Sequence, residues 1–377
     1  MNFEWTEEQR ELQAATRAFC AQELTDGDGS QEWFRNTWKK CGEFGIQGLK
    51  VSKEFGGTDA DHLTVIGVLE ALGYSCRDNG LIFSLNAQMW ACQHPIERFG
   101  TTEQKEKYLP GLCDGSLIGA HAMSEPDAGS DAFALSTTAT PVEGGFLLNG
   151  SKTFVTNAPL ADVFVVFARA PGTQGFAGLS GFVIDRASPG LSVGPPLQKM
   201  GLNNSFMGEV FFDDCLVSDQ DLLGRRGTGM PIFAAAMELE RSMILASTIG
   251  TMERGLERSV AYARERRQFQ QPIGKFQAVS HRLVEMKLRL ETARLLLYRV
   301  GWMLDNGHSA TLDSALVKLY LGESFVASAI DALQIFGGYG YMTEYGLERD
   351  VRDALASRLY SGTSDIQRNL AARHMGL

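Results

Sequence analysis

A glutamate that interrupts an apolar helical stripe is the clearest sign of chemistry in this sequence. Glu240 shares one helical face with three apolar residues, whereas Glu238 does not; the three are Phe233, Met237 and Ile244. A carboxylate on a buried face is costly unless it is paired or neutralised, and burial raises its pKa toward the value that a general base needs. Glu240 is therefore the candidate base.

Two segments in the middle of the chain could hold a planar polar ring or a phosphate. Residues 123–131 combine small and hydroxyl side chains after a β-type run, which leaves backbone amides free to bind such a group; the alternative is an ordinary turn. In the second segment, 150–157, strand alternation places Phe154 and Thr156 on one face. One could stack on a ring while the other hydrogen-bonds it, and the alternative is a cross-strand packing pair.

Three later segments have side chains or backbone suited to a cofactor. The basic loop 264–277 could grip a pyrophosphate through guanidinium groups, and the glycines of 334–341 allow close approach of backbone to a ligand. Residues 359–368 form a loop that feeds a helix, whose free amides favour an anion. The alternatives are a solvated helix end, a C-cap and an N-cap.

Charge and composition exclude several classes of protein. The net charge is −10, which disfavours broad binding to nucleic acid, and no apolar run reaches the roughly 18 residues that a membrane helix needs. The acidic start is unlike a secretory signal, and the six cysteines show no Cys-x-x-Cys pair. The histidines lack metal-ligand spacing. We expect a cytoplasmic protein with reduced thiols, no metal, and neither nucleic acid nor membrane as a partner.

The periodicity of the sequence changes twice along the chain. A helical pattern, which opens with Thr6 and Gln9 in capping-box spacing, predicts a helical domain over 1–116, with helices at 31–44, 60–75, 79–98 and 102–113. Short β-type runs then predict an antiparallel sandwich or barrel over 117–227. Long helical runs return over 228–377, at 230–265, 276–305 and 309–335, with a terminal helix from about 362. The predicted fold is α+β, and its last domain is a four-helix bundle.

Taken together and in this order, these segments resemble the acyl-CoA dehydrogenase family over essentially the whole chain. The resemblance implies FAD held between the β domain and the C-terminal helices, in a homotetramer or dimer of dimers whose second subunit completes each site. Contacts implied within one subunit are Met123, Ser124, Ser130, Phe154, Val155, Thr156, Thr363 and Asp365. Contacts implied from the neighbouring subunit are Arg266, Phe269, Gln277, Gln334, Gly337 and Gly338. Gln270 stands where glycine is common in the family.

The resemblance also bears on the base. Many members carry a catalytic glutamate in Tyr-Glu-Gly-Thr, but residues 360–363 here read Tyr-Ser-Gly-Thr, and the Ser361 hydroxyl is too weak a base. Isovaleryl-type members instead use a glutamate that precedes an arginine on the first long C-terminal helix, which matches Glu240 and Arg241. The alternative role for Glu240 is a structural ion pair with Arg241 or Arg254.

The resemblance implies a reaction as well as a site. Glu240 would take the α-proton of an acyl thioester while the β-hydrogen leaves as hydride to the flavin. The thioester carbonyl would be polarised by a flavin hydroxyl and the Ser361 amide, with Ser130, Arg241 and Tyr360 as further substrate contacts. The reduced flavin would then pass its electrons to an electron-transfer flavoprotein or to oxygen.

Residues 79–90 look like the subgroup that acts on aminoacyl groups tethered to carrier proteins, notably prolyl carrier protein dehydrogenases of natural-product pathways. The alternative for this segment is a buried helix without influence on substrate choice. Three other functions stay open: a short- or branched-chain acyl-CoA dehydrogenase, a flavin oxidase or monooxygenase on the same fold, and a non-catalytic thioester-binding protein.

Overall fold

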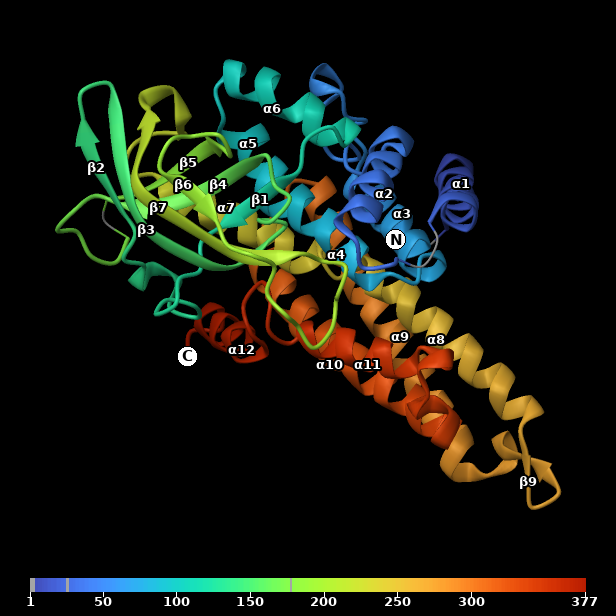
Figure 1. Ribbon diagram of the computed structural model, residues 1–377. Coiled ribbons are helices and arrows are strands. Elements are labelled where there is room, and N and C mark those ends of the chain that lie inside the picture. The colour runs from blue at the N-terminus through green and yellow to red at the C-terminus, as the bar shows by residue number, and fades with distance from the viewer. Residues whose placement is uncertain (1–3, 25–26, 177) are drawn as a thin grey trace.

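The computed structural model describes residues 4–24, 27–176 and 178–377, and Figure 1 shows three regions along the chain. Helices form the first region, a twisted sheet the second, and long helices the third. The predicted fold class is therefore confirmed. The N-terminal helices are α1 (Glu7–Glu23), α2 (Gln31–Phe44), α3 (His62–Ser75), α4 (Asn79–Gln88), α5 (His94–Phe99) and α6 (Thr102–Asp114).

Capping side chains fix where these helices begin. The predicted capping box of α1 is present: the Thr6 hydroxyl accepts from the Gln9 amide, and the Gln9 side chain accepts from the Thr6 amide. Such caps satisfy amides that have no partner within the helix. The helix predicted over 79–98 continues from α4 to α5 through a π-helical segment, Met89–Gln93. This extra-wide turn was not predicted, and such turns are frequent at functional sites.

The middle region is a single curved sheet, ordered β6-β7-β3-β2-β4-β5-β8, with β1 paired to β4. All its pairings are antiparallel except that β1 and β2 each run parallel to β4. The strands are β1 (Gly119–Ala122), β2 (Thr138–Val142), β3 (Gly145–Thr156), β4 (Val163–Arg169), β5 (Leu179–Asp185), β6 (Leu191–Val193), β7 (Met207–Ser218) and β8 (Leu222–Leu223). The predicted antiparallel pairing is therefore found everywhere except at β4, where β1 and β2 pair in parallel because the β2–β3 hairpin lies between β1 and β4 in the chain.

The third region is a bundle that extends away from the sheet (Figure 1). Its helices are α7 (Gly229–Met243), α8 (Ala246–Glu265), α9 (Gln277–Asp305), α10 (Thr311–Phe336), α11 (Leu347–Ala356) and α12 (Ser364–His374). The single helix predicted over 230–265 is two helices, which are separated at Ile244 and Leu245. Helix α11 was not predicted. A two-stranded hairpin, β9 (Arg267–Gln268) and β10 (Gln271–Pro272), joins α8 to α9.

Close packing of α3 on α8 joins the first region to the third. A Cβ added to Gly73 would lie 1.8 Å from the Ser247 carbonyl oxygen, and one added to Gly250 would lie 2.0 Å from that of Glu70. Any larger residue would therefore push the helices apart. This contact fixes the start of α8, and with it the end of α7, relative to the N-terminal helices.

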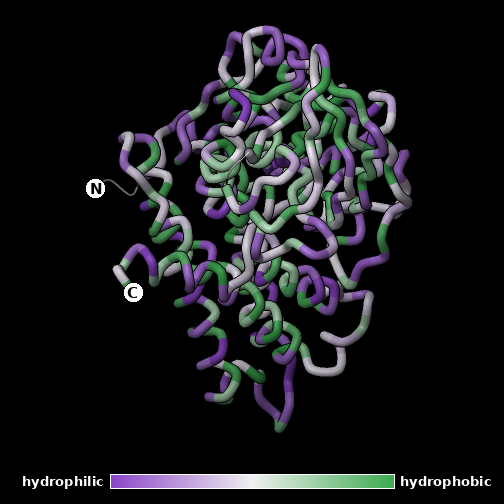
Figure 2. The backbone as a smooth tube through the Cα atoms, turned by 90° about the vertical axis from the view of Figure 1, so that its left-hand side faces the viewer, coloured by the Kyte–Doolittle hydropathy of each residue, from purple (hydrophilic) through white to green (hydrophobic). Residues whose placement is uncertain are grey.

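Polar and apolar residues alternate along the helices in Figure 2. None of the described helices combines the length and the hydropathy needed to cross a bilayer. The described residues also contain no group of three or more His, Cys, Asp or Glu side chains placed to hold a metal ion.

Candidate active site

Glu240 lies near the end of α7 with its side chain turned inward, and the residue is only 8% exposed. Burial raises the pKa of this carboxyl to about 6, against the lowering effects of the Ser361 hydrogen bond and of the charges on Arg241 and Lys318. The Ser361 hydroxyl donates to Oε1 at 2.6 Å, while Oε2 is buried without a hydrogen-bond partner among the described residues. One oxygen is thus held and the other is free to accept a proton.

A structural ion pair does not account for this glutamate. Arg254 donates instead to the carbonyl oxygens of Gly73, Tyr74 and Cys76, at the end of α3. Arg241 is half-buried, and its buried Nε has no hydrogen-bond partner among the described residues. Its positive charge favours the ionised form of Glu240 without an ion pair of the usual geometry.

The loop that follows α11 presents Ser361 in a strained, left-handed conformation. Ser361 has φ 54° and Gly362 has φ 86°, and the Gln367 side chain donates to both of their carbonyl oxygens, at 3.1 and 2.9 Å. The backbone amide of Ser361 donates no hydrogen bond within the described part of the chain. This amide is therefore available to a carbonyl oxygen of a ligand, as an oxyanion-hole donor must be.

Tyr360 and a buried lysine form the wall beside this loop. The Tyr360 ring lies 4.6 Å from that of Phe83, measured between ring centroids, so α4 reaches the site. The fully buried Lys318 donates to the Ser357 carbonyl oxygen at 2.7 Å, and its ammonium group lies 5.5 Å from the Tyr360 ring centroid. Burial lowers the pKa of Lys318 to about 8. Sequence reasoning missed Lys318, although its place in the apolar run 315–321 was a usable signal.

A buried ion pair connects the loop 123–131 to strand β3, and sequence reasoning missed it. Lys152 is fully buried and its ammonium donates to Glu125 at 2.8 Å and to the Met123 carbonyl oxygen at 3.1 Å. Glu125 also accepts from the amides and hydroxyls of Ser136 and Thr137. The Lys152 charge and these hydrogen bonds lower the pKa of Glu125 to about 2, although burial acts in the opposite direction. The loop is thus fixed against β3.

The residues predicted to cover a ring lie where β3 is irregular. The pairing of β3 with β7 shifts register between Lys152 and Val155, and Phe154 has φ 54°. Phe154 is 65% exposed and Thr156 half-buried, so the two lie outward, whereas the Val155 side chain is buried in the core. Val155 can therefore offer only backbone atoms to a ligand. In the neighbouring loop Met123 is buried, Ser124 half-buried and Ser130 exposed.

Helix α12 begins beside the Ser361 loop. The Thr363 hydroxyl caps the helix by accepting from the Ile366 amide, and Asp365 lies in the first turn with its carboxylate exposed. The first amides of an α-helix favour a negatively charged group. The start of α12 could therefore bind part of a pyrophosphate.

The remaining predicted cofactor residues lie at the far end of the bundle, around β9 (Figure 1). Phe269 is 87% exposed with φ 49°, and the neighbouring Gln270 has φ 66°, a conformation that explains why glycine is common there. The Arg266 guanidinium lies 5.4 Å from the Tyr339 ring centroid, so the hairpin and the end of α10 are adjacent. The others at this end are exposed: Gln277, Gln334, Gly337 and Gly338.

The predicted site residues thus form two groups at opposite ends of one chain (Figure 1). We call the first the base group; it comprises Glu240, Ser361, the start of α12, the loop 123–131 and strand β3. The second, the hairpin group, comprises Arg266, Phe269 and the end of α10. Both groups fit FAD in their chemistry: the first exposes an aromatic ring beside hydroxyls, and the second combines a guanidinium, an exposed ring and Gly338, whose surroundings are open. A single chain does not bring the two groups together.

Comparison with known proteins gives consistent results along the whole chain. Residues 6–116, 120–215 and 227–376 match the N-terminal, middle and C-terminal domains of acyl-CoA dehydrogenases. An L-prolyl-[peptidyl-carrier protein] dehydrogenase of Pseudomonas fluorescens is 42% identical, with both chains covered in full.

Two solved structures extend this similarity to three dimensions. The prolyl acyl carrier protein oxidase AnaB superposes with a TM-score of 0.96 at 46% identity, covering 99% of this chain and 100% of the other. PigA with FAD and proline superposes with a TM-score of 0.96 at 41% identity, and both chains are fully covered. From the matched domains and the full-length relatives, this chain belongs to the acyl-CoA dehydrogenase family.

Proposed function

We propose that this chain catalyses FAD-dependent α,β-dehydrogenation of an aminoacyl thioester, and that its substrate is a prolyl group on a carrier protein. The observation that carries this proposal is the Glu240 carboxylate, which is buried, has a raised pKa, and keeps one oxygen without a hydrogen-bond partner among the described residues. A base of this kind matches the removal of a weakly acidic C–H proton near neutral pH. The full-length similarity to proteins named for prolyl carrier substrates supports the choice of thioester.

The residues around Glu240 have separate roles in this proposal. Oε2 of Glu240 accepts the α-proton, while the Ser361 hydroxyl holds Oε1 and fixes the direction of the carboxylate. The Ser361 amide, which has no acceptor in the described part of the chain, donates to the thioester carbonyl oxygen and stabilises the negative charge that develops there. Tyr360 and Phe83 shield the reacting carbons from water. FAD, when bound, supplies the acceptor for the β-hydrogen as hydride.

We assign the flavin contacts to both groups of residues. Phe154 and Thr156 would cover the ring, and Met123, Ser124 and Ser130 would line it. Thr363 and Asp365, at the start of α12, would complete the grip on the cofactor. Because Arg266, Phe269 and Gly338 lie at the other end of the chain, we assign them to the site of a neighbouring subunit in a homotetramer.

The six buried, unpaired cysteines are typical of a reducing compartment, which supports a cytoplasmic location.

Anaerobic mixing with candidate thioesters tests the substrate. Purified holoprotein is mixed with prolyl-loaded carrier protein, with the same carrier lacking proline, and with butyryl-CoA and isovaleryl-CoA, while flavin absorbance is followed. We expect bleaching with the prolyl carrier alone. Bleaching only with an acyl-CoA would overturn the carrier assignment in favour of a short- or branched-chain acyl-CoA dehydrogenase, and no bleaching at all would indicate a non-catalytic binding protein.

A second candidate function is a thioester oxidase, in which oxygen reoxidises the flavin. The similarity to a protein named as an oxidase favours it. Admitting air after anaerobic reduction separates the two, because an oxidase recovers its flavin absorbance within the turnover time and produces one hydrogen peroxide for each flavin reoxidised. Slow recovery in air, with fast recovery in the presence of an electron-transfer flavoprotein, would identify a dehydrogenase.

A further inference from the structure

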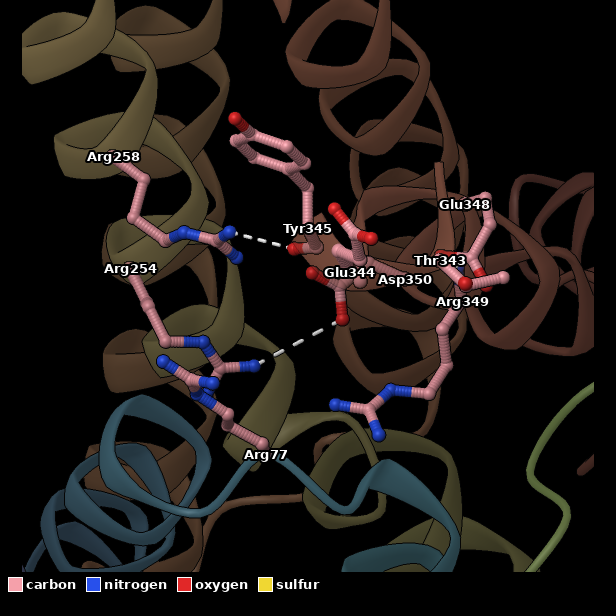
Figure 3. A pocket seen from close by; sticks show the side chains of 10 residues that line it. Arg77, Arg254, Arg258, Thr343, Glu344, Tyr345, Glu348, Arg349 and Asp350 are labelled. Carbon is pink, nitrogen blue, oxygen red and sulfur yellow. Dashed lines mark hydrogen bonds and ion pairs between the residues drawn. The ribbon is translucent and has the colours of Figure 1, made fainter. Parts of the chain in front are cut away.

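A polar cavity of about 280 Å³ opens beside the bundle, at a place where no predicted site residue lies. Its walls come from three separate parts of the chain: the connection between α3 and α4, helix α8, and residues 343–350 before and within α11. Figure 3 shows the side chains that line it, with guanidinium groups from opposite walls facing the same space.

The charged residues that line this cavity include one more arginine than carboxylates, although the whole chain carries −10. Four arginines and three carboxylates line it; the arginines are Arg77, Arg254, Arg258 and Arg349, and the acids are Glu344, Glu348 and Asp350. Two of the acids are already engaged. Glu348 pairs with Arg352 at 3.0 Å, and the buried Asp350 accepts from the Asn79 amide group and pairs with Arg254 at 4.0 Å.

The arginines are held close together at a cost. Burial lowers the pKa of Arg254 and Arg258, and the charges of Arg77 and Arg349 lower both further, while Asp350 acts in the opposite direction. Arg77 is exposed and forms no ion pair among the described residues. An anion placed between these groups would relieve the repulsion and give Arg77 a partner.

We propose that this cavity binds a small molecule through an oxyanion, a phosphoryl or carboxylate group. Guanidinium groups present paired N–H donors that match both of these groups in a bidentate manner. The volume of about 280 Å³ exceeds that of a bare phosphate ion, so there is space for a small organic part as well. A protein segment fits less well, because the lining is concave and carries little apolar surface.

The position of the cavity connects it to the base group. Arg77 lies just before Asp78, the N-cap of α4, and Phe83 of α4 packs on Tyr360. Asp350 lies in α11, which leads into the loop that holds Ser361. Asn79 already joins the two helices by donating to Asp350 and Asp353. An anion bound between Arg77 and the opposite wall would therefore tie α4 to α11 more firmly.

Thermal unfolding of the holoprotein in the presence of anions tests this site. The probes are inorganic phosphate, pyrophosphate and citrate, each compared with sodium chloride at the same ionic strength, and binding is then measured by titration calorimetry. The variant is Arg77→Gln, which removes one exposed charge without breaking a hydrogen bond. Arg225→Gln is the matched control, because this exposed arginine lies before α7 and does not line the cavity.

We expect at least one of the three anions to raise the unfolding temperature of wild type and of Arg225→Gln, and to bind Arg77→Gln about tenfold more weakly. Tighter binding of phosphate or pyrophosphate would identify a phosphoryl group as the ligand, and tighter binding of citrate would identify a carboxylate. Equal shifts in all three proteins would be a general salt effect and would overturn the proposal. Response to an acidic carrier protein without response to any small anion would also overturn it, in favour of a docking surface.

Discussion

The base group and the hairpin group differ in how complete they are within one chain. In the base group, buried polar side chains have partners within the chain: the Ser361 hydroxyl donates to Glu240, and the Lys152 ammonium donates to Glu125. Around Phe269 the side chains are exposed, and the glycines at the end of α10 face open space. Buried networks of the first kind position chemistry, whereas exposed rings beside glycines form a surface that another molecule completes.

The largest effect is expected when the base itself is replaced. Glu240→Gln removes the proton acceptor and keeps the shape of the side chain. We expect the rate of flavin reduction by substrate to fall by about 10²- to 10⁴-fold with flavin content unchanged, since general bases contribute on this scale. Stopped-flow absorbance measures the rate. Glu238→Gln is the control on the same helix, because Glu238 binds Thr311 and Ala310 instead, and a similar loss in that variant would remove Glu240 from its role.

The buried ion pair of Lys152 with Glu125, which joins β3 to the loop 123–131, tests whether contacts within one chain hold the base group in place. Lys152→Met leaves Glu125 as an uncompensated buried charge, so we expect a loss of about 3 to 5 kcal/mol in the free energy of unfolding, measured in urea. Adding Glu125→Gln should recover part of that loss. Lys107→Met, which breaks an exposed pair with Asp185, should cost less than about 1 kcal/mol; equal losses would show that burial is not the cause.

Mixing two inactive variants tests whether the hairpin group serves the site of a neighbouring subunit. A chain with Glu240→Gln lacks the base, and a chain with both Arg266→Gln and Phe269→Ala lacks the hairpin contacts. If each site combines the base group of one subunit with the hairpin group of its neighbour, co-expressed chains that assemble at random should regain activity at about a quarter of the sites. Activity that stays at the sum of the separate variants would place both groups in the site of the same chain.

The smallest expected effect concerns the cap of α12. Thr363→Ala should lower the free energy of unfolding by about 1 kcal/mol, as loss of a helix cap does, and should also weaken flavin binding. Ser30→Ala removes the comparable cap of α2, far from the site, and should cost similar stability with flavin affinity unchanged. Equal weakening of flavin binding in both variants would contradict a flavin role for the start of α12.

The sequence allowed the main elements to be predicted wherever periodicity was strong. Helices such as α2, α3 and α6 were found because caps and apolar spacing agree over several turns. The break between α7 and α8 was missed because 244–245 are Ile and Leu, which carry no turn signal. Helix α11 was missed because it is short and rich in charge, although Leu347, Val351 and Leu355 recur at helical spacing and give it an apolar face.

For the site, the sequence located the base but not what holds it. Glu240 stood out because a charge within an apolar stripe is visible locally. The partnership of Glu125 with Lys152 joins a loop to a strand through the fold, and spacing alone cannot show which buried charges meet. The cavity around Arg77 could not be predicted for the same reason, since its four arginines come from three segments that lie far apart in the sequence.

The pH dependence of anaerobic flavin reduction tests the role of Glu240 most directly. Because the ionised carboxylate is the base, the wild-type rate should rise with pH, with a midpoint near the pKa of about 6, and then level off. The hydrogen bond from Ser361 lowers that pKa, so Ser361→Ala should move the midpoint to higher pH. A rate that does not fall at low pH, or a midpoint that Ser361→Ala leaves unchanged, would contradict a proton transfer to Glu240.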